Sequence, residues 1–391
     1  CKKRAGERKM KKLTSRERVR RAVRGHDVDM IPLMLQIEPH TILTLATKVR
    51  PPKNPIKAAA WKALADFSAN FPNKDIGQYM TLLSLNYAKD YFSELGGDFS
   101  DYLWTPIPLW FRGAGFKEDK LFIKDMYGEK HFIGGQYLEM GELPCPDKDT
   151  LASYQFPDVS HPVNFSHVRI ARRANPDAFM LGCAPGVQDW GQRFHPMQSI
   201  YTGMIEYPEI IKGFFEKLCD HSLVIIRGML EAGCDAICVQ DDYGTQQSML
   251  ISKKMWTEFT YPMIKRQIEE IHACGGIAML HSCGVVAPLL DKLADAGLDV
   301  LHPFQPLPGN DLAAAKKEYG NRLCFATGMC VQRIGQLSPE DAYKDIVGTA
   351  KVAAEGGRFI LAHTNGLQND TPIENLKAMF EAIDDVRAFR F

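Results

Sequence analysis

His281 and Cys283 stand two residues apart in the stretch IAMLHSCG, which runs from Ile277 to Gly284. Residues i and i+2 of a β-strand project to the same side, so an imidazole and a thiolate at a strand end can bind one metal ion together. Zinc accepts this pair of ligands. From 11 His and 10 Cys in 391 residues, about 0.28 such pairs are expected by chance, so the spacing alone does not establish a metal site.

A zinc site also needs a third protein ligand. Cys330 is our first candidate, because it follows a strand-like run in the stretch CFATGMC. His302 and His363 are the alternatives, since each also follows an apolar run. If no metal binds, His281 would be a hydrogen-bonded histidine at a strand end and Cys283 a packing residue.

The elements that must position these residues alternate between short apolar strands and amphipathic helices. Six strands are predicted at residues 178–183, 235–240, 277–281, 299–302, 322–327 and 359–362. Residues 30–35 predict a first strand, and the region 96–104 offers a second. Strands without polar alternation indicate a parallel sheet covered by helices. Eight strand–helix units predict an α/β fold, a (β/α)8 TIM barrel, in one domain over residues 1–391.

Two segments stand outside this alternation. Residues 123–144 combine aromatic, β-branched and glycine residues, which predicts an inserted β-hairpin. Residues 1–24 hold twelve Lys or Arg against Glu7 and Glu17, and we interpret them as a basic, solvated arm that leads into a helix. Contact with nucleic acid is the alternative, although the arm lacks the aromatic residues on which bases stack.

The active site of a TIM barrel is built at the carboxyl ends of the strands, so polar residues there are candidates. Asp241 and Asp242 are the expected catalytic residues, as a general base, a substrate contact or a further metal ligand. Because neighbours on a strand point to opposite sides, only one of the two should face the mouth. The candidate substrate-binding residues are Gln36, Glu38, Gln188, Asp189, Tyr243, His302 and His363.

Composition narrows the classes of function. Lys and Arg (47) balance Asp and Glu (47), which gives no indication of a nucleic-acid or membrane partner. We see no apolar run of membrane-spanning length and no signal peptide. The ten cysteines lie mostly in apolar segments, which favours a reducing cytoplasm. The sequence contains no G-x-x-x-x-G-K-[ST] phosphate loop and no convincing G-x-G-x-x-G, which disfavours nucleotide-driven chemistry.

Several stretches resemble the uroporphyrinogen decarboxylase superfamily. They are LTSRERVRRAVRGHDVDMIPLML, DDYGTQQSMLISKKMWTEFTYPMIKRQIEEIHACGGIAMLHSCG, GLDVLHPFQP and NDTPIENLKAMFEAI. The resemblance covers residues 13–386 and is densest from residue 235 onward. It implies a (β/α)8 barrel, in agreement with the strand count.

The superfamily has at least two chemistries. The true decarboxylases are metal-free and grip porphyrinogen carboxylates with N-terminal arginines, yet here no arginine lies between Arg24 and Arg50. We therefore favour the cobamide-dependent methyltransferase branch, whose thiol-using members hold zinc through H-x-C and a later cysteine. The resemblance then implies zinc at His281 and Cys283. It also implies methyl transfer between a small thiol, methyl ether or methylated amine and a cobamide carried by a corrinoid partner protein. A homodimer is the assembly to test.

The sequence departs from that branch at one position. The later cysteine falls in a P-G-C-G turn after the last strand, where this chain reads AHTNGLQ with Asn365 in the corresponding place. Either Cys330 or His363 replaces the ligand, or the site has changed or lost its metal. The alternatives are a metal-free decarboxylase or lyase, with Arg112, Arg193 or Arg333 at the mouth, and a non-catalytic barrel that binds a small ligand.

Overall fold

The parallel sheet is the centre of the molecule. The computed structural model describes residues 11–70, 91, 94–99, 111–117, 120–134 and 137–391. Seven strands pair in the order β1-β11-β10-β9-β8-β7-β6, and every pair is parallel. Their bounds are β1 (Leu33–Met34), β6 (Leu181–Pro185), β7 (Ala236–Gln240), β8 (Ile277–His281), β9 (Val300–His302), β10 (Cys324–Met329) and β11 (Phe359–His363). The six strands predicted after residue 176 are confirmed, with bounds that shift by up to three residues.

The two edges of this sheet meet around Asp98 and Phe99. The Asp98 N–H donates to the Leu33 carbonyl in β1 at 2.9 Å, and the Phe179 N–H donates to the Asp98 carbonyl at 3.3 Å. Phe99 also forms a parallel bridge with Phe179, just before β6. The segment therefore lies where a second strand was expected. Residues 100–104 of that expected strand lie outside the described residues.

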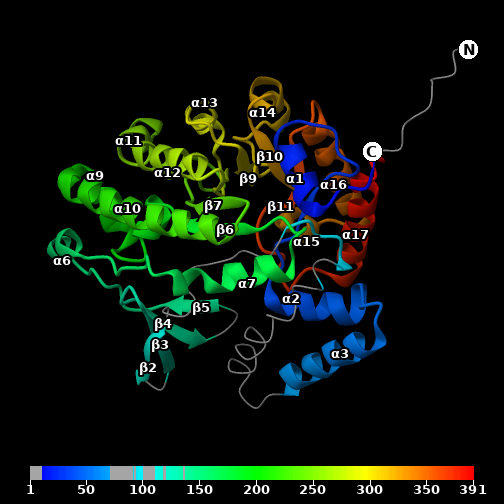
Figure 1. Cartoon of the computed structure of the whole chain (residues 1–391), viewed down its shortest axis with the longest axis horizontal. Coiled ribbons are helices and arrows are strands. Elements are labelled where there is room, and N and C mark those ends of the chain that lie inside the picture. Colours follow the sequence, from blue (N-terminus) through cyan, green and yellow to red (C-terminus); the bar gives the residue numbers. More distant parts are fainter. Residues whose placement is uncertain (1–10, 71–90, 92–93, 100–110, 118–119, 135–136) are drawn as a thin grey trace, which may run out of the picture.

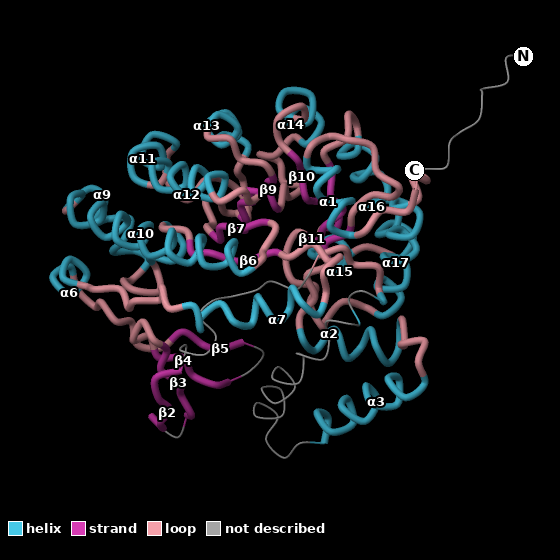
Figure 2. Tube along the Cα trace, in the orientation of Figure 1, coloured by secondary structure: helices cyan, strands magenta, loops and turns pink. Residues whose placement is uncertain are grey.

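Helices surround the sheet, as the cyan segments around the magenta strands show in Figure 2. Ser252 and Ser338 act as N-caps, accepting from the Met255 and Asp341 amides at 3.2 and 3.1 Å. In order they are α1 (Ser15–Val23), α2 (Pro39–Thr44), η1 (Leu45–Val49), α3 (Pro55–Asn70), α6 (Lys148–Ser153), η3 (Pro162–Phe165), α7 (Ser166–Ala174), α8 (Gln188–Gly191), α9 (Met197–Glu206), α10 (Pro208–Ala232), α11 (Lys253–Phe259), α12 (Tyr261–Ala273), η4 (Ala287–Leu289), α13 (Leu290–Asp295), α14 (Leu312–Tyr319), α15 (Val331–Gln336), α16 (Pro339–Ala354) and α17 (Ile373–Arg387).

Alternate residues of each strand serve two different cores. Ile277 and Met279 of β8 belong to the small cluster enclosed by the sheet, whereas Ala278 and Leu280 belong to the outer cluster under the helices. Both faces are apolar, which explains why the strands lack polar alternation. Continuing the alternation along β8 places His281 on the enclosed side.

The N-terminal helix α1 is tied to the sheet through buried carboxylates. Asp98 is 2 % exposed and pairs with Arg18, and Arg387 lies 3.1 Å from its second oxygen. Arg18 also pairs with Asp29 at 2.7 Å. Burial alone would raise the pKa of Asp29, but the hydrogen bonds from Arg18 and the Leu13 amide outweigh it and lower that pKa.

A second buried carboxylate uses other arginines of the same helix. Asp235 is fully buried and pairs with Arg16 at 2.6 Å, Arg20 at 2.7 Å and Arg172. Val19 of α1 packs into the enclosed core. The expected helix is present as α1, but its arginines are more than solvated side chains, because they compensate carboxylates that would otherwise be buried without a counter-charge. Residues 1–10 of the arm lie outside the described residues.

A separate antiparallel sheet stands beside the main body, lower in the view of Figure 1. It contains β2 (Phe111–Lys117), β3 (Lys120–Asp125), β4 (Lys130–Gly134) and β5 (Tyr137–Met140), paired in that order. The excursion predicted at residues 123–144 is thus a larger, four-stranded sheet in the described chain. Among the described helices, none is long and apolar enough to cross a membrane.

The Arg18 ion pairs give a test of this architecture. Replacing Arg18 by Met keeps the aliphatic volume but removes both ion pairs, so that of the two arginines paired with Asp98 only Arg387 remains. We expect the free energy of unfolding, measured by urea denaturation, to fall by about 3–5 kcal/mol. Arg24→Met, at the exposed end of the same helix, should change it by less than about 0.5 kcal/mol. Equal losses in the two variants would contradict this account.

Candidate metal site

Asp242, His281 and Cys283 come together at the carboxyl ends of β7 and β8. One ligand atom from each lies within 4.8 Å of the other two. His281 Nε2 is 3.5 Å from Cys283 Sγ and 3.8 Å from Asp242 Oδ1. The predicted His281–Cys283 pair is therefore assembled on one side, and a carboxylate joins it.

Backbone contact between two loops creates this group. Gly244 follows β7 and Gly284 follows β8, and a Cβ on Gly284 would lie 2.3 Å from the Gly244 carbonyl carbon. Gly284 also has a φ of +83°, which glycine adopts without strain. This close approach lets the Cys283 N–H donate to Asp242 Oδ1 at 2.7 Å.

Two buried amide side chains hold the loop after β8, and our list of candidate site residues omitted both. Gln305 Oε1 accepts from the Gly284 N–H at 2.5 Å. Asn310 Oδ1 accepts from the Val286 and Ala287 amides at 3.1 and 3.0 Å, and its Nδ2 donates to the Gly284 carbonyl at 2.9 Å. Gln305 follows a predicted strand, which was a usable signal. Asn310 carries no local signal for this role, because the loop that it holds lies more than twenty residues earlier in the chain.

The adjacent aspartates divide as the strand geometry predicts. Asp242 shares the enclosed side with His281, and its side chain is 38 % exposed. Asp241 is 2 % exposed, and its carboxylate accepts from the Val187 and Asp189 amides at 3.1 and 2.6 Å. Asp241 was expected to be catalytic, but its oxygens hold the turn after β6 and face away from the His281–Cys283 pair.

Two histidines that we expected to line the mouth of the barrel, His302 and His363, are buried. His302 is fully buried, with Nδ1 at 2.9 Å from His281 Nδ1 and Nε2 at 2.8 Å from the His363 carbonyl oxygen. His363 is fully buried as well; its Nδ1 accepts from the Gln36 N–H at 3.2 Å and its Nε2 lies 3.4 Å from Met379 Sδ. Both rings are occupied by protein contacts, so neither is placed to bind a substrate or to replace a missing ligand.

The other substrate-binding candidates separate by burial. Gln188 is fully buried between Thr260, from which it accepts at 3.0 Å, and the Asp242 carbonyl, to which it donates at 3.3 Å. Tyr243 is fully buried against Trp256, with ring centroids 5.3 Å apart. These two residues support the loops.

The remaining candidates are less buried. Asp189 is half-buried, and burial together with the negative charge of Asp242 raises its pKa. Glu38 packs over Gly366, where a Cβ would lie 2.1 Å from its Oε1 atom. Gln36 keeps a buried Oε1 atom that accepts no hydrogen bond from the described residues.

Cys330 does not join the group that the described residues form. It is 5 % exposed at the start of α15, and the structure brings Asp242 to His281 and Cys283 instead. Asn365, which stands where the resemblance implies a later cysteine, is nearby, because its Nδ2 atom lies 3.6 Å from Cys283 Sγ. The turn after β11 therefore reaches the site with an amide in place of a thiol.

The electrostatics of the group favour a cation. Burial, reinforced by Asp242 and Asp189, raises the pKa of the Cys283 thiol to about 12. Burial and the Asp242 charge raise the pKa of Asp189 to about 6, although Arg193 opposes the shift. Burial lowers the pKa of His281, so its imidazole is neutral, as a metal ligand must be. Imidazole, thiol and carboxylate together match the donors that zinc prefers.

A second group of donors is already compensated by a cation. This group contains Asp125, Glu129 and His131, whose ligand atoms also lie within 4.8 Å of one another. Arg193, however, contacts Glu129 at 2.7 Å and Asp125 at 3.3 Å. This ion pair fastens the antiparallel sheet to the loop after β6. Among the described residues, Asp242 pairs with no Lys or Arg, so it has charge left to bind a metal.

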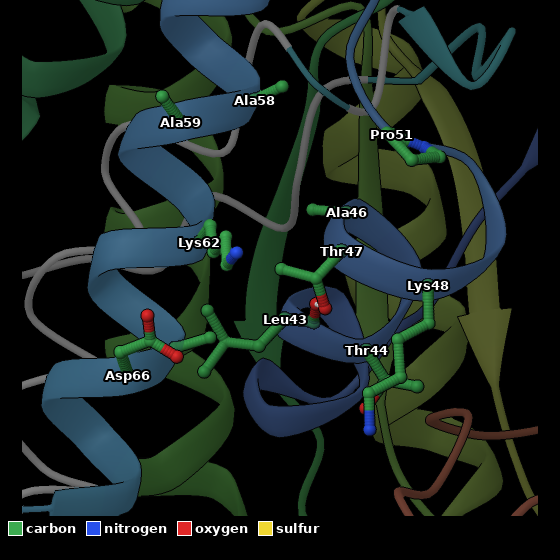
Figure 3. A pocket seen from close by; sticks show the side chains of 11 residues that line it. Leu43, Thr44, Ala46, Thr47, Lys48, Pro51, Ala58, Ala59, Lys62 and Asp66 are labelled. Carbon is green, nitrogen blue, oxygen red and sulfur yellow. Dashed lines mark hydrogen bonds between the residues drawn. The ribbon is translucent and has the colours of Figure 1, made fainter.

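A cavity of about 770 Å³ lies elsewhere, between η1 and α3 (Figure 3). Leu43, Thr47, Lys62 and Asp66 project toward one another across it in Figure 3. The residues that line it include none of the predicted site residues and no cysteine or histidine. It therefore adds nothing to the metal-binding group.

Part of the chain is similar in sequence to two kinds of known enzyme. Methylcobamide:CoM methyltransferase MtaA of Methanosarcina barkeri is 25% identical over 228 residues, which are 58% of this chain and 64% of that protein. Uroporphyrinogen decarboxylase of Crocosphaera subtropica is 25% identical over 190 residues, 46% of this chain and 48% of that protein. The chain thus spans less than two thirds of the length of these relatives.

The whole fold and the family follow from two further comparisons. A methyltransferase from Methanosarcina mazei has a similar structure, with a TM-score of 0.62 at 19% identity over 96% of this chain and 99% of that one. That likeness shows the fold alone. The family model of uroporphyrinogen decarboxylase (URO-D) matches residues 191–386, which are half of the chain and include Asp242, His281 and Cys283. The chain therefore belongs to the uroporphyrinogen decarboxylase family.

Proposed function

We propose that this protein is a zinc-dependent methyltransferase that moves a methyl group between a small substrate and a cobamide carried by a corrinoid protein. The observation that carries the proposal is the Asp242–His281–Cys283 group at the carboxyl ends of β7 and β8. The sequence similarity of the chain to methylcobamide:CoM methyltransferase MtaA supports the choice of reaction. The substrate class is a thiol, a methyl ether or a methylated amine.

The charge around the group argues against a decarboxylase that binds a polycarboxylate. Asp242 and Asp189 make this region acidic, so it would repel an anionic substrate. Arg193 pairs with Asp125 and Glu129, and Arg333 pairs with Asp345 at 2.8 Å, so both arginines are already engaged. A small thiol, ether or amine carries no such charge.

The residues take separate roles in this proposal. His281 Nε2, the Cys283 thiolate and an Asp242 oxygen would hold zinc, with a further position open for the substrate. When bound, zinc lowers the pKa of a coordinated thiol, so that a thiolate is available near neutral pH. The Cys283 thiol would have to give up its proton to bind zinc, which its pKa of about 12 makes costly unless a cation compensates the charge. Asp189 and Glu38 are the proposed substrate contacts.

Zinc binding tests the ligand assignment directly. Protein purified without chelators should contain about one zinc per chain by elemental analysis. His281→Ala and Cys283→Ser should bind zinc at least about 100-fold more weakly, because each removes one of three ligands. Cys274→Ser, at an exposed cysteine on the end of α12, is the matched control and should bind normally. Wild-type protein that takes up no zinc would refute the site.

Methyl transfer tests the reaction. Methylcobalamin stands in for the partner's cobamide, and loss of its methyl group is followed by visible absorption under anaerobic conditions with a panel of thiols. We expect at least about tenfold acceleration by the zinc-loaded protein with one class of thiol. Removing the zinc should abolish the acceleration and restoring it should recover the rate. If no thiol reacts and neither methyl ethers nor methylated amines donate to reduced cobalamin, the barrel is a binding protein or another enzyme.

Asn365 offers a test of the departure from the family pattern. Asn365→Cys would add a second thiol beside Cys283, and under reducing conditions we expect zinc to bind about tenfold more tightly. Asn365→Ser is the matched control, since serine is similar in size to cysteine but has no thiol group. Equal zinc affinities in the two variants would show that the turn after β11 does not reach the metal.

A further inference from the structure

His302 lies behind the proposed zinc ligand and faces the same enclosed space. The parallel register places His281 beside His302, and Gln240 lies on the other side of His281. His302 Nδ1 is 2.9 Å from His281 Nδ1, and His302 Nε2 is 2.8 Å from the His363 carbonyl oxygen. Two rings and a carbonyl therefore form a continuous line of hydrogen bonds from β11 to β8.

The carbonyl at the end of this line determines which atom is the donor in each hydrogen bond. A carbonyl oxygen can only accept, so His302 Nε2 must carry its hydrogen and donate it. If His302 is neutral, its Nδ1 atom has a lone pair and must accept. His281 Nδ1 must then be the donor across the 2.9 Å contact, which leaves the lone pair of His281 on Nε2. Nε2 is the atom that faces Cys283 and Asp242.

The surroundings of His302 support its neutral form. His302 is fully buried, and no carboxylate contacts it among the described interactions. An imidazolium there would be a buried charge without a partner, which is costly. The opposite neutral form would place the Nε2 lone pair against the carbonyl lone pairs at 2.8 Å, which is repulsive. Therefore only one neutral tautomer of each ring satisfies both contacts, with the hydrogen on Nε2 in His302 and on Nδ1 in His281.

We infer that His302 is a positioning residue that fixes His281 with its Nδ1 atom protonated and its Nε2 lone pair directed toward the metal. The inference rests on the proposed zinc site at His281 and Cys283. Metal-bound histidines commonly donate their second ring hydrogen to a carboxylate, a carbonyl or water. Here the acceptor is a neutral imidazole, which orients His281 without adding a third negative charge beside Asp242 and Asp189.

The arrangement also connects the ligand to the strand that ends beside Asn365. The acceptor for His302 is the carbonyl of His363, two residues before Asn365, whose side chain contacts Cys283. The end of β11 thus reaches His281 through His302, and the turn that follows β11 reaches Cys283 through Asn365. A displacement of β11 would change both zinc ligands together.

The first experiment reads the tautomer without any metal. Full-length protein labelled with ¹⁵N-histidine and stripped of metal should show His281 as the Nδ1–H tautomer and His302 as the Nε2–H tautomer by long-range ¹H–¹⁵N NMR. His281→Ala and His302→Phe identify the two sets of signals. An Nε2–H tautomer at His281 would overturn the inference. Because this reading needs no metal, it is independent of whether the proposed function holds.

The second experiment measures the effect on metal binding. His302→Phe removes the acceptor, and we expect zinc affinity, measured by competition with a chelator, to fall about 10- to 100-fold. The visible bands of the Co²⁺-loaded protein should also shift. His302→Asn, which keeps an acceptor near Nδ1, should recover part of the affinity and the wild-type bands. Unchanged affinity and bands in a folded His302→Phe protein would overturn the inference, whereas wild-type protein that binds neither metal would overturn the proposed function.

Discussion

The alternation of side chains along parallel strands is the constraint on which the site depends. Ile277 and Met279 fill the space that the sheet encloses, and the next residue of the same parity in β8 is His281. The same rule places Asp242 beyond Ala236 and Cys238 of β7, and His302 beyond Val300 of β9. The register puts His281 level with His302 and with Gln240. Asp242 follows two residues after Gln240, and its Oδ1 atom lies 3.8 Å from His281 Nε2. A shift of one residue in any strand would turn its polar residue to the outer face.

The two ends of the sheet treat buried charge in opposite ways. Near α1, Asp98 and Asp235 are each matched by two or more arginines, so their charge is compensated within the protein. At the carboxyl ends, Asp242 accepts from the Cys283 N–H and lies near His281, but it pairs with no Lys or Arg of the described chain, and Cys283 keeps its proton. The first arrangement stabilises the fold. The second leaves a region of negative potential where the proposed metal ion would supply the missing positive charge.

The ligand group combines a family pattern with a local change. His281 and Cys283 have the H-x-C spacing, whereas Asn365 stands where the resemblance to thiol-using methyltransferases implies a further cysteine. Asp242 occupies the third corner, and the Cys283 amide orients its carboxylate. A carboxylate is a harder ligand than a thiolate, so this group would favour zinc less strongly over other divalent metals than a site with two cysteines. Zinc itself still accepts oxygen, nitrogen and sulfur together.

The sequence by itself determined the alternating strands and helices, the parallel sheet, and the pair His281 and Cys283, because each follows from local periodicity. It also indicated that only one of Asp241 and Asp242 could face the mouth, because strand parity is a local property. The tertiary structure alone decided that Asp242 rather than Cys330 joins the pair, since that depends on the contact between Gly244 and Gly284. It also decided that His302 and His363 are buried supports, because their partners come from other strands. Contacts between residues distant in the chain leave no periodic pattern, so only the folded arrangement reveals them.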